Sequence, residues 1–534
     1  MISAHYLPHA ATHRFSPLVV DYLHDAGAFK DFIAHLPDFS GIEKAIEARR
    51  SFPTNREGLY EELKRQYSGV EIGEKVARNL ELLRAENTFT ICTAHQPALF
   101  TGALYFVYKI IHTARLAADL KARFPEANFV PVFYIGSEDN DLEELGHFQL
   151  GEKAFQWDGG GQTGAVGRMK TDALQPLLKE VLSRLGPPGE ATERLVDILQ
   201  DAYAKGRTIA EATRRLVNSL LGDFGVVVVD GDSAFFKEKM TAVFEEDLFH
   251  HKPFELVTAQ SEALGEKYPA QAFPRPINLF YLDNGIRQRI EKDGDAWVVT
   301  GTDLRWTKPE LRDLLAKFPQ KFSPNVVLRG LFQETILPDV AFIGGGAEVA
   351  YWMQLKPLFE QYGVPFPVIV LRQSVQWIDG KGRGLMEKTG LNEAQLFEHP
   401  EDLLKEYTHT HAVTDWNLEA IREAIAAQLQ PVFQKATQLD PTLEAYGAAR
   451  QKEIDRVISG IETKIFRAEK RRHDVWYDRV LRLQKALSLD KGLQERRLTF
   501  LDFYPSLGPA FLHALYAHTR PFGDQFLILE TNNL

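Results

Sequence analysis

Short apolar runs rich in β-branched and aromatic residues recur along the first 371 residues, and each is followed by a polar or glycine-containing turn. The periodicity of an amphipathic helix follows most of these runs, as over 104–120 and 348–362. Alternating strands and helices predict an α/β fold with a parallel sheet. The expected strands cover residues 89–93, 129–135, 226–230, 340–343 and 367–371.

The run at 226–230 is almost entirely valine, which is typical of a strand covered on both faces. In sheets of this kind, ligands bind outside the carboxyl ends of the strands. The candidate functional residues are therefore expected directly after each run.

The strands are unevenly spaced along the chain. The stretches at about 150–220 and 235–325 are too long for simple crossovers, so we expect them to be insertions into the core. The glycine-rich segment 159–164 lies in the first of them, and no clear strand precedes it. It is therefore expected to be a flexible loop rather than a phosphate cradle.

The pattern changes after Ser374 to long, charged helices. Apolar residues recur there at steps of three and four, which predicts a helical hairpin or a short coiled coil. A second copy of the chain could cover this stripe and form a homodimer, or segments 415–436 and 475–487 could cover it within one chain. The stripe comprises Ile454, Ile458, Ile461, Ile465 and Ala468. We expect a core domain at 1–375 and a helical domain at 376–534.

The composition excludes several classes of protein and of site. The chain has 62 lysines and arginines against 73 aspartates and glutamates, a net charge of −11, which argues against a nucleic-acid binder. A single cysteine, Cys92, excludes an intrachain disulfide and a cysteine-rich zinc site, and we expect it to end a buried strand. No export signal and no apolar run of ~18 residues is evident, so a cytoplasmic protein without a membrane anchor is expected.

The turn after the first strand is a candidate site for an anion. It runs Thr-Ala-His-Gln-Pro-Ala-Leu-Phe-Thr-Gly over 93–102, between an expected strand and an expected helix. Free backbone amides and the helix dipole favour a negative charge at such a turn. His95, Gln96, Thr101 and Gly102 could bind there, although a structural role for the histidine is the alternative.

An acidic run follows the second strand. Glu138 and Asp139 lead it, and Asp141, Glu143 and Glu144 continue it. Such a run is commonly a solvated turn. At the end of a core strand, however, a carboxylate could hold a substrate ammonium, bind hydrated magnesium or accept a proton from an attacking amine.

The fourth region places three glycines, Gly344, Gly345 and Gly346, between a strand and a helix, where a ligand can approach the backbone. Neither a dinucleotide fingerprint nor a Walker motif occurs in the chain. Arg329 and Arg372 each follow an apolar run. Their guanidinium groups suit carboxylate recognition, and structural ion pairs are the alternative.

A basic stripe lies on the expected helix near residue 468, and it includes Lys464, Arg467 and Arg471. A solvated helix face is its simplest interpretation, and contact with a nucleotide or an acidic partner is the more specific one. The stripe is too small to indicate nucleic-acid binding.

Several motifs together resemble one family, the bacillithiol biosynthesis cysteine-adding enzymes (BshC). They occur in order along nearly the whole chain, which is more specific than any single motif. The matching segments are 93–105, 131–141, 278–281, 323–334, 348–352 and 493–496. Asn140 stands where the family usually has histidine.

The resemblance implies a Rossmann-like core with connecting-peptide insertions and a C-terminal coiled-coil domain that makes a homodimer. It also implies a ligase that joins cysteine to glucosaminyl-malate through an amide bond, in the last step of bacillithiol synthesis. The alternative is a nucleotide-responsive binding or scaffold protein without turnover. ATP or ADP with magnesium is the implied cosubstrate, and no zinc is expected.

The implied chemistry assigns roles to the candidates. Asp139, Glu138 and His95 are the expected catalytic residues. Arg329, Arg372 and Lys356 would hold the malyl carboxylates. The full set of residues expected to bind substrate is Gln96, Thr101, Gly102, Arg329, Arg372, Lys356, Glu348 and Tyr351. A nucleotide would contact Gly344, Gly345, Gly346, Lys464, Arg467 and Arg471.

Overall fold

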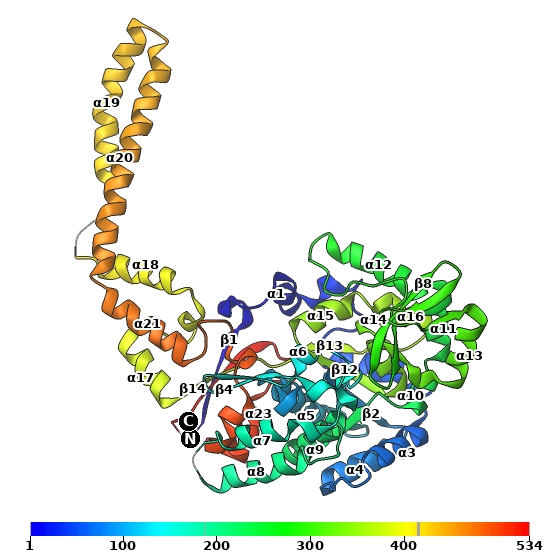
Figure 1. The fold of residues 1–534 in the computed structure, drawn as a ribbon. Coiled ribbons are helices and arrows are strands. Elements are labelled where there is room, and N and C mark those ends of the chain that lie inside the picture. Colours follow the sequence, from blue (N-terminus) through cyan, green and yellow to red (C-terminus); the bar gives the residue numbers. More distant parts are fainter. Residues whose placement is uncertain (1, 187, 414–416, 533–534) are drawn as a thin grey trace. The chain divides into compact units, whose positions relative to one another are not determined.

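The computed structural model describes residues 2–186, 188–413 and 417–532 (Figure 1). The chain divides into two compact units, Met1–Gly380 with Gly492–Leu534, and Lys381–Lys491. This division differs from the expected one, because residues 492–534 return to the first unit instead of joining the helical domain. The reason is a strand, β15 (Gln525–Glu530), that pairs with the N-terminal strand.

The predicted parallel sheet is confirmed. Its strand order is β13-β12-β2-β3-β6, and every neighbouring pair is parallel. The parallel arrangement places the carboxyl ends of all five strands along one edge of the sheet. The strands are β2 (Thr88–His95), β3 (Asn128–Ile135), β6 (Val227–Asp230), β12 (Asp339–Gly344) and β13 (Val368–Leu371).

Both faces of this sheet are buried, as the valine-rich run predicted. On one face, Ile343 packs in a cluster with residues of α2 (Phe39–Arg50) and α5 (Tyr105–Arg123). The next side chain toward the strand's start, Phe342, points to the opposite face and joins the larger core. The alternation of side chains along each strand therefore supplies both layers of helices with apolar contacts.

The helix expected over 348–362 is broken in two. The structure has α15 (Gly346–Met353) and α16 (Lys356–Tyr362), and the chain changes direction at Gln354 and Leu355. Pro357 explains the break, because proline has no N–H to donate and fits only the first turn of a helix.

The two expected insertions have different architectures. The first contains α7 (Gln175–Leu182), α8 (Glu190–Ala202) and α9 (Ile209–Leu221), which lie together in Figure 1. The second contains α10 (Ala234–Glu238), α11 (Thr241–His250), α12 (Lys252–Gly265) and α13 (Lys308–Lys317), with an antiparallel sheet of order β10-β9-β8-β7-β11. Its strands are β7 (Leu279–Asp283), β8 (Ile286–Asp293), β9 (Ala296–Val299), β10 (Arg305–Thr307) and β11 (Phe322–Pro324).

A third sheet joins the two ends of the chain. Strand β15 lies between β1 (Ser3–Pro8), to which it runs antiparallel, and β14 (Val375–Ile378), to which it runs parallel. The last strand of the chain therefore belongs to the same unit as the first.

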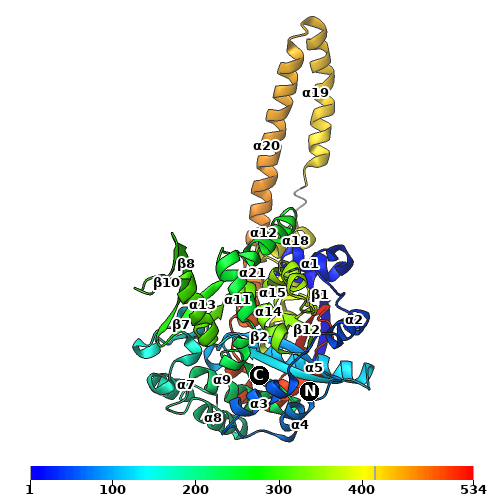
Figure 2. The same cartoon turned by 90° about the vertical axis from the view of Figure 1, so that its right-hand side faces the viewer.

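The second unit is helical, and its predicted hairpin is present. Helices α19 (Glu419–Leu439) and α20 (Leu443–Arg471) pack against each other as an antiparallel pair (Figure 2). Ile458 is buried on α20, whereas Ile461 remains 46% exposed. Part of the apolar stripe is thus covered within the chain, and the homodimer stays a prediction. Among the described residues, no helix is both long and apolar enough to cross a bilayer.

Candidate active site

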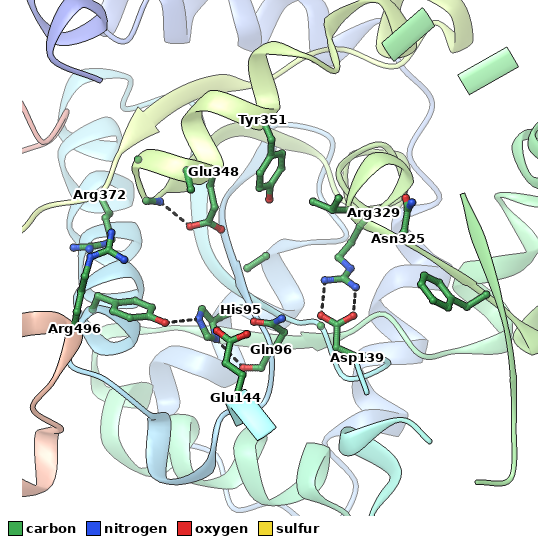
Figure 3. A pocket seen from close by; sticks show the side chains of 18 of the residues that line it. His95, Gln96, Asp139, Glu144, Asn325, Arg329, Glu348, Tyr351, Arg372 and Arg496 are labelled. Carbon is green, nitrogen blue, oxygen red and sulfur yellow. Dashed lines mark hydrogen bonds and ion pairs between the residues drawn. The ribbon is translucent and has the colours of Figure 1, made fainter. Parts of the chain in front are cut away.

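A cavity of about 500 Å³ opens at the carboxyl edge of the parallel sheet (Figure 3). The ends of β2, β3 and β13 and the start of α15 contribute to its lining, together with residues of the second insertion and of the C-terminal segment. Nine residues expected from the sequence line it: His95, Gln96, Asp139, Arg329, Gly345, Gly346, Glu348, Tyr351 and Arg372. The position of the strand ends thus brings together residues from distant parts of the chain.

Asp139 is held by two arginines. Both of its carboxylate oxygens accept hydrogen bonds from the guanidinium of Arg329, as the dashed lines in Figure 3 show, and Nη2 of Arg287 lies 3.1 Å from Oδ1. Burial alone would raise the pKa of Asp139, but the two positive charges outweigh it and hold the pKa below its usual range. Asp139 is therefore an ionised anchor and a weak proton acceptor.

A second ion pair joins the partly buried Glu348 to the buried Lys109. The Lys109 Nζ donates to both carboxylate oxygens at 2.8 and 2.7 Å, and it also donates to the Ala94 carbonyl. Glu348 in turn accepts the Gly345 N–H at 2.7 Å, which caps the start of α15. Burial lowers the pKa of Lys109, while the Glu348 charge opposes that change. The pair fixes α5 against α15 beneath the cavity.

Arg372 forms a third pair, with Glu495 from the C-terminal segment. Its Nη1 and Nη2 donate to the two carboxylate oxygens at 3.0 and 2.6 Å, and both side chains are buried. The next residue, Arg496, also lines the cavity and is exposed. Of the four arginines on the cavity, Arg496 is the one without a carboxylate partner among the described residues.

His95 is a neutral hydrogen-bonding group. Burial, together with the Lys109 charge, lowers its pKa to about 4, so the imidazole is uncharged at neutral pH. Nδ1 lies 2.9 Å from the Gln96 carbonyl and therefore carries the proton, because a carbonyl oxygen only accepts. Nε2 is then the acceptor for the Tyr105 hydroxyl at 3.3 Å.

Glu144 is the carboxylate of this cavity with a raised pKa. Partial desolvation beside the cavity is the main cause, although the residue is exposed, and the negative charges of Asp141 and Asp139 add to it. No ion pair neutralises Glu144 among the described residues, and its side chain reaches the cavity beside the labelled His95 and Gln96 in Figure 3. Its carboxylate can therefore accept a proton more readily than Asp139 can.

Glu138 lies behind the cavity and does not line it. It is 4% exposed and accepts a hydrogen bond from the fully buried Lys237, whose Nζ also lies 3.2 Å from Asp232. Burial raises the pKa of Glu138, while Lys237 opposes the rise. Its place in the core suits a positioning residue for its neighbour Asp139.

The remaining candidates of the first unit do not line this cavity. Thr101 and Gly102 are buried in the turn before α5, and Gly344 ends β12. Lys356 Nζ donates to the Lys30 carbonyl instead of facing the cavity. The exposed basic residues Lys464, Arg467 and Arg471 lie on α20 in the other unit.

Other functional candidates emerged only from the structure. Glu144 belongs to the acidic run and Arg496 to one of the family motifs, so the sequence contained a signal for both. Lys109 lies within a helix and Arg287 within the antiparallel insertion, and neither position is distinctive in the sequence. No cluster of three or more metal-ligating side chains occurs among the residues described.

The comparisons with known proteins agree with this architecture. A family model described as bacillithiol biosynthesis BshC, N-terminal Rossmann-like domain, matches residues 2–373. A second, described as bacillithiol biosynthesis BshC, C-terminal coiled-coil domain, matches residues 375–531. The two models cover almost the entire chain.

Curated relatives match over nearly their full length. A protein of Flavobacterium johnsoniae is 36% identical over 96% of this chain and 97% of its own. Proteins of Cytophaga hutchinsonii and Christiangramia forsetii are 36% and 35% identical, covering 92% and 97% of this chain and the same shares of their own. All three carry the name "Putative cysteine ligase BshC".

We expect Arg329→Met to destabilise the protein by about 3 kcal/mol at pH 7, because it leaves the buried Asp139 carboxylate with Arg287 alone. A carboxylate with a depressed pKa contributes stability above its unfolded pKa and loses it as the pH falls. The loss of stability of the variant relative to the unmodified protein should therefore become smaller below about pH 4, where Asp139 in the variant takes up a proton. Urea unfolding followed by circular dichroism measures the free energy of unfolding of both proteins at pH 7 and at pH 3.5.

Arg305→Met is the matched control, since Arg305 and Asp293 form an exposed pair. It should change stability little at either pH. Equal free energies of unfolding for Arg329→Met and the control would show that the ion pair between Arg329 and Asp139 does not stabilise the fold.

Proposed function

Because the chain belongs to the bacillithiol biosynthesis BshC family, we propose that it is a cysteine ligase that joins the cysteine carboxyl group to the amine of glucosaminyl-malate, in the last step of bacillithiol synthesis. The names of the relatives support a cysteine ligase. The observation that carries the proposal is the cavity itself, which presents an unpaired cation and a proton-accepting carboxylate at the strand ends. A scaffold protein without turnover would need neither.

Arg496 is our candidate for binding a malyl carboxylate. Arg329 and Arg372 were the expected residues, but each already faces a protein carboxylate. A guanidinium can form two parallel hydrogen bonds with a carboxylate, and only an unpaired one gains a full charge interaction from the substrate. Arg496 has a guanidinium group without a carboxylate partner among the described residues, and it lies on the same cavity wall as Arg372 (Figure 3).

Glu144 is our candidate for the general base. Amide formation requires the sugar amine to lose a proton so that its lone pair can attack the activated carboxyl carbon of cysteine. A raised carboxylate pKa brings the acceptor closer to the pKa of the amine and makes the transfer easier. The proton would move from the amine nitrogen to a Glu144 oxygen as the C–N bond forms and the leaving group departs.

His95 and Asp139 would then act by position and charge. The neutral His95 and the Gln96 amide can donate to or accept from a substrate oxygen. Asp139 stays ionised and, with its arginines, keeps the wall of the cavity in place. We assign the amide-forming proton transfer to neither.

The glycine turn fits a nucleotide phosphate poorly. The Gly345 N–H is already bonded to Glu348, and the negative charge of that carboxylate opposes a phosphate at the start of α15. Lys109 offsets that charge from below the turn. The amide-forming step therefore does not involve this turn, and the product assay below measures whether ATP takes part.

The product assay tests the proposal directly. Purified protein is incubated with cysteine and glucosaminyl-malate, with and without ATP and magnesium, and the mixtures are analysed by mass spectrometry. We expect a new species whose mass is the sum of the two substrates less one water. No such species in any arm, from folded protein, would contradict the ligase assignment.

Arg496→Ala should raise the KM for glucosaminyl-malate about tenfold or more, because the substrate loses a charge-assisted hydrogen bond. Steady-state kinetics with varied glucosaminyl-malate measures it. Lys356→Ala removes a cation that lies outside the cavity and should leave the KM unchanged. Equal effects of the two substitutions would exclude Arg496 from substrate binding.

Glu144→Gln should lower kcat by about 100-fold, since the amide cannot take up the proton. In the unmodified enzyme, activity should rise with pH as Glu144 ionises, and the variant should lack this acidic limb. A pH profile of kcat measures both effects. Glu143→Gln alters an exposed neighbour that does not line the cavity and should keep the profile. An acidic limb that persists in Glu144→Gln would assign the base to another residue.

A further inference from the structure

A second cavity, of about 640 Å³, lies at the carboxyl ends of β3 and β6. Residues of α3 (Arg56–Gln66), of the turn near Arg168 and of the segment leading into α9 line it. Ser137 faces this cavity, whereas Asp139, two residues later, faces the first. The two cavities therefore belong to one unit but have separate linings.

The lining of the second cavity is cationic. It carries six positive side chains and three carboxylates, and two further carboxylates outside the lining, Glu62 and Asp201, pair with Arg65, Arg207 and Arg215. The excess is then one positive charge in a chain whose net charge is −11. The carboxylates of the lining are Glu211, Asp230 and Asp232. The cations are Arg65, Arg168, Lys205, Arg207, Arg214 and Arg215.

Several of these cations have unused hydrogen-bonding capacity. Arg214 is 5% exposed and donates from Nη2 to Gln66 at 2.7 Å, but its buried Nε has no partner. The buried Nη1 of Arg207 also lacks a partner, while its Nη2 faces Asp201. Lys205 is exposed at the cavity and faces no carboxylate among the described residues. A buried guanidinium N–H without an acceptor is costly, so such an atom indicates a missing acceptor.

The start of α9 adds little to the positive character. Helix α9 begins at Ile209, and its first turn, including Ala210 and Glu211, lies on the cavity. The positive end of the helix dipole lies there, but the Glu211 carboxylate accepts the Thr208 N–H at 2.7 Å and already supplies a negative charge, as Glu348 does at α15. Apolar side chains contribute little to the lining, which argues against a hydrophobic ligand.

From these observations we propose that the second cavity binds a small polyanion of the diphosphate class. Oxygens of two linked phosphate groups would accept from Lys205 Nζ and from the guanidinium groups of Arg214 and Arg207, which line the cavity. Planar guanidinium groups match phosphate oxygens as they match carboxylates. The site requires neither the ligase reaction nor its substrates, so it stands apart from the proposed function.

Calorimetric titration of the full chain with inorganic diphosphate at low ionic strength tests the site. We expect one bound diphosphate per chain, weaker binding of inorganic phosphate, and weaker binding at high salt. Lys205→Ala should weaken diphosphate binding about tenfold or more, because an exposed cation is lost without disturbing the core. Arg214→Gln should do the same, and circular dichroism checks that it folds.

Two control variants locate the binding. Lys179→Ala removes an exposed cation of α7 that does not line the cavity and should bind diphosphate normally. Arg496→Ala alters the first cavity and should also bind normally. The proposal is overturned if diphosphate does not bind, if Lys205→Ala binds like Lys179→Ala, or if Arg496→Ala loses the binding.

Discussion

A charge buried at the strand ends of this protein is stable only opposite another charge. Desolvation penalises an isolated ion far more than any single contact stabilises it, so four charged groups in and behind the wall of the first cavity each face a partner of opposite sign among the described residues. These pairs connect the strand ends to α5, to the second insertion and to the C-terminal segment. They are Asp139 with Arg329 and Arg287, Glu348 with Lys109, Arg372 with Glu495, and Glu138 with Lys237.

The same pairing decides which groups remain available for chemistry. A paired arginine and a paired carboxylate satisfy each other and gain little from a substrate. What is left at the first cavity is Arg496, a cation without a carboxylate, and Glu144, a carboxylate whose pKa is raised rather than lowered. The ion pairs thus hold the wall of the cavity in place, and the unpaired Arg496 and Glu144 remain available to bind substrate and to accept a proton.

Much of the fold could be predicted from the sequence, because a strand buried on both faces leaves a continuous apolar run. The position of the cavity followed from the same runs, since parallel strands end along one edge. The ion-pair partners could not be predicted, because they are distant in sequence. Arg329 and Asp139 are 190 residues apart, and Arg372 and Glu495 are 123 apart. An arginine after an apolar run therefore resembled a substrate ligand, although the fold supplies its carboxylate partner.

The third sheet also sets the order in which the chain can complete its structure. Strand β1 is made long before its partner β15, because the rest of the first unit and the whole helical unit lie between them in the sequence, and Glu495 also appears only after the helical unit. At roughly 5–20 residues per second, the N-terminal strand waits on the order of 25–100 s for its neighbour. Until Glu495 is made, Arg372 lacks its carboxylate and the first cavity lacks one wall. The nascent core thus carries an open sheet edge, and its active site closes only after these late segments have folded onto it.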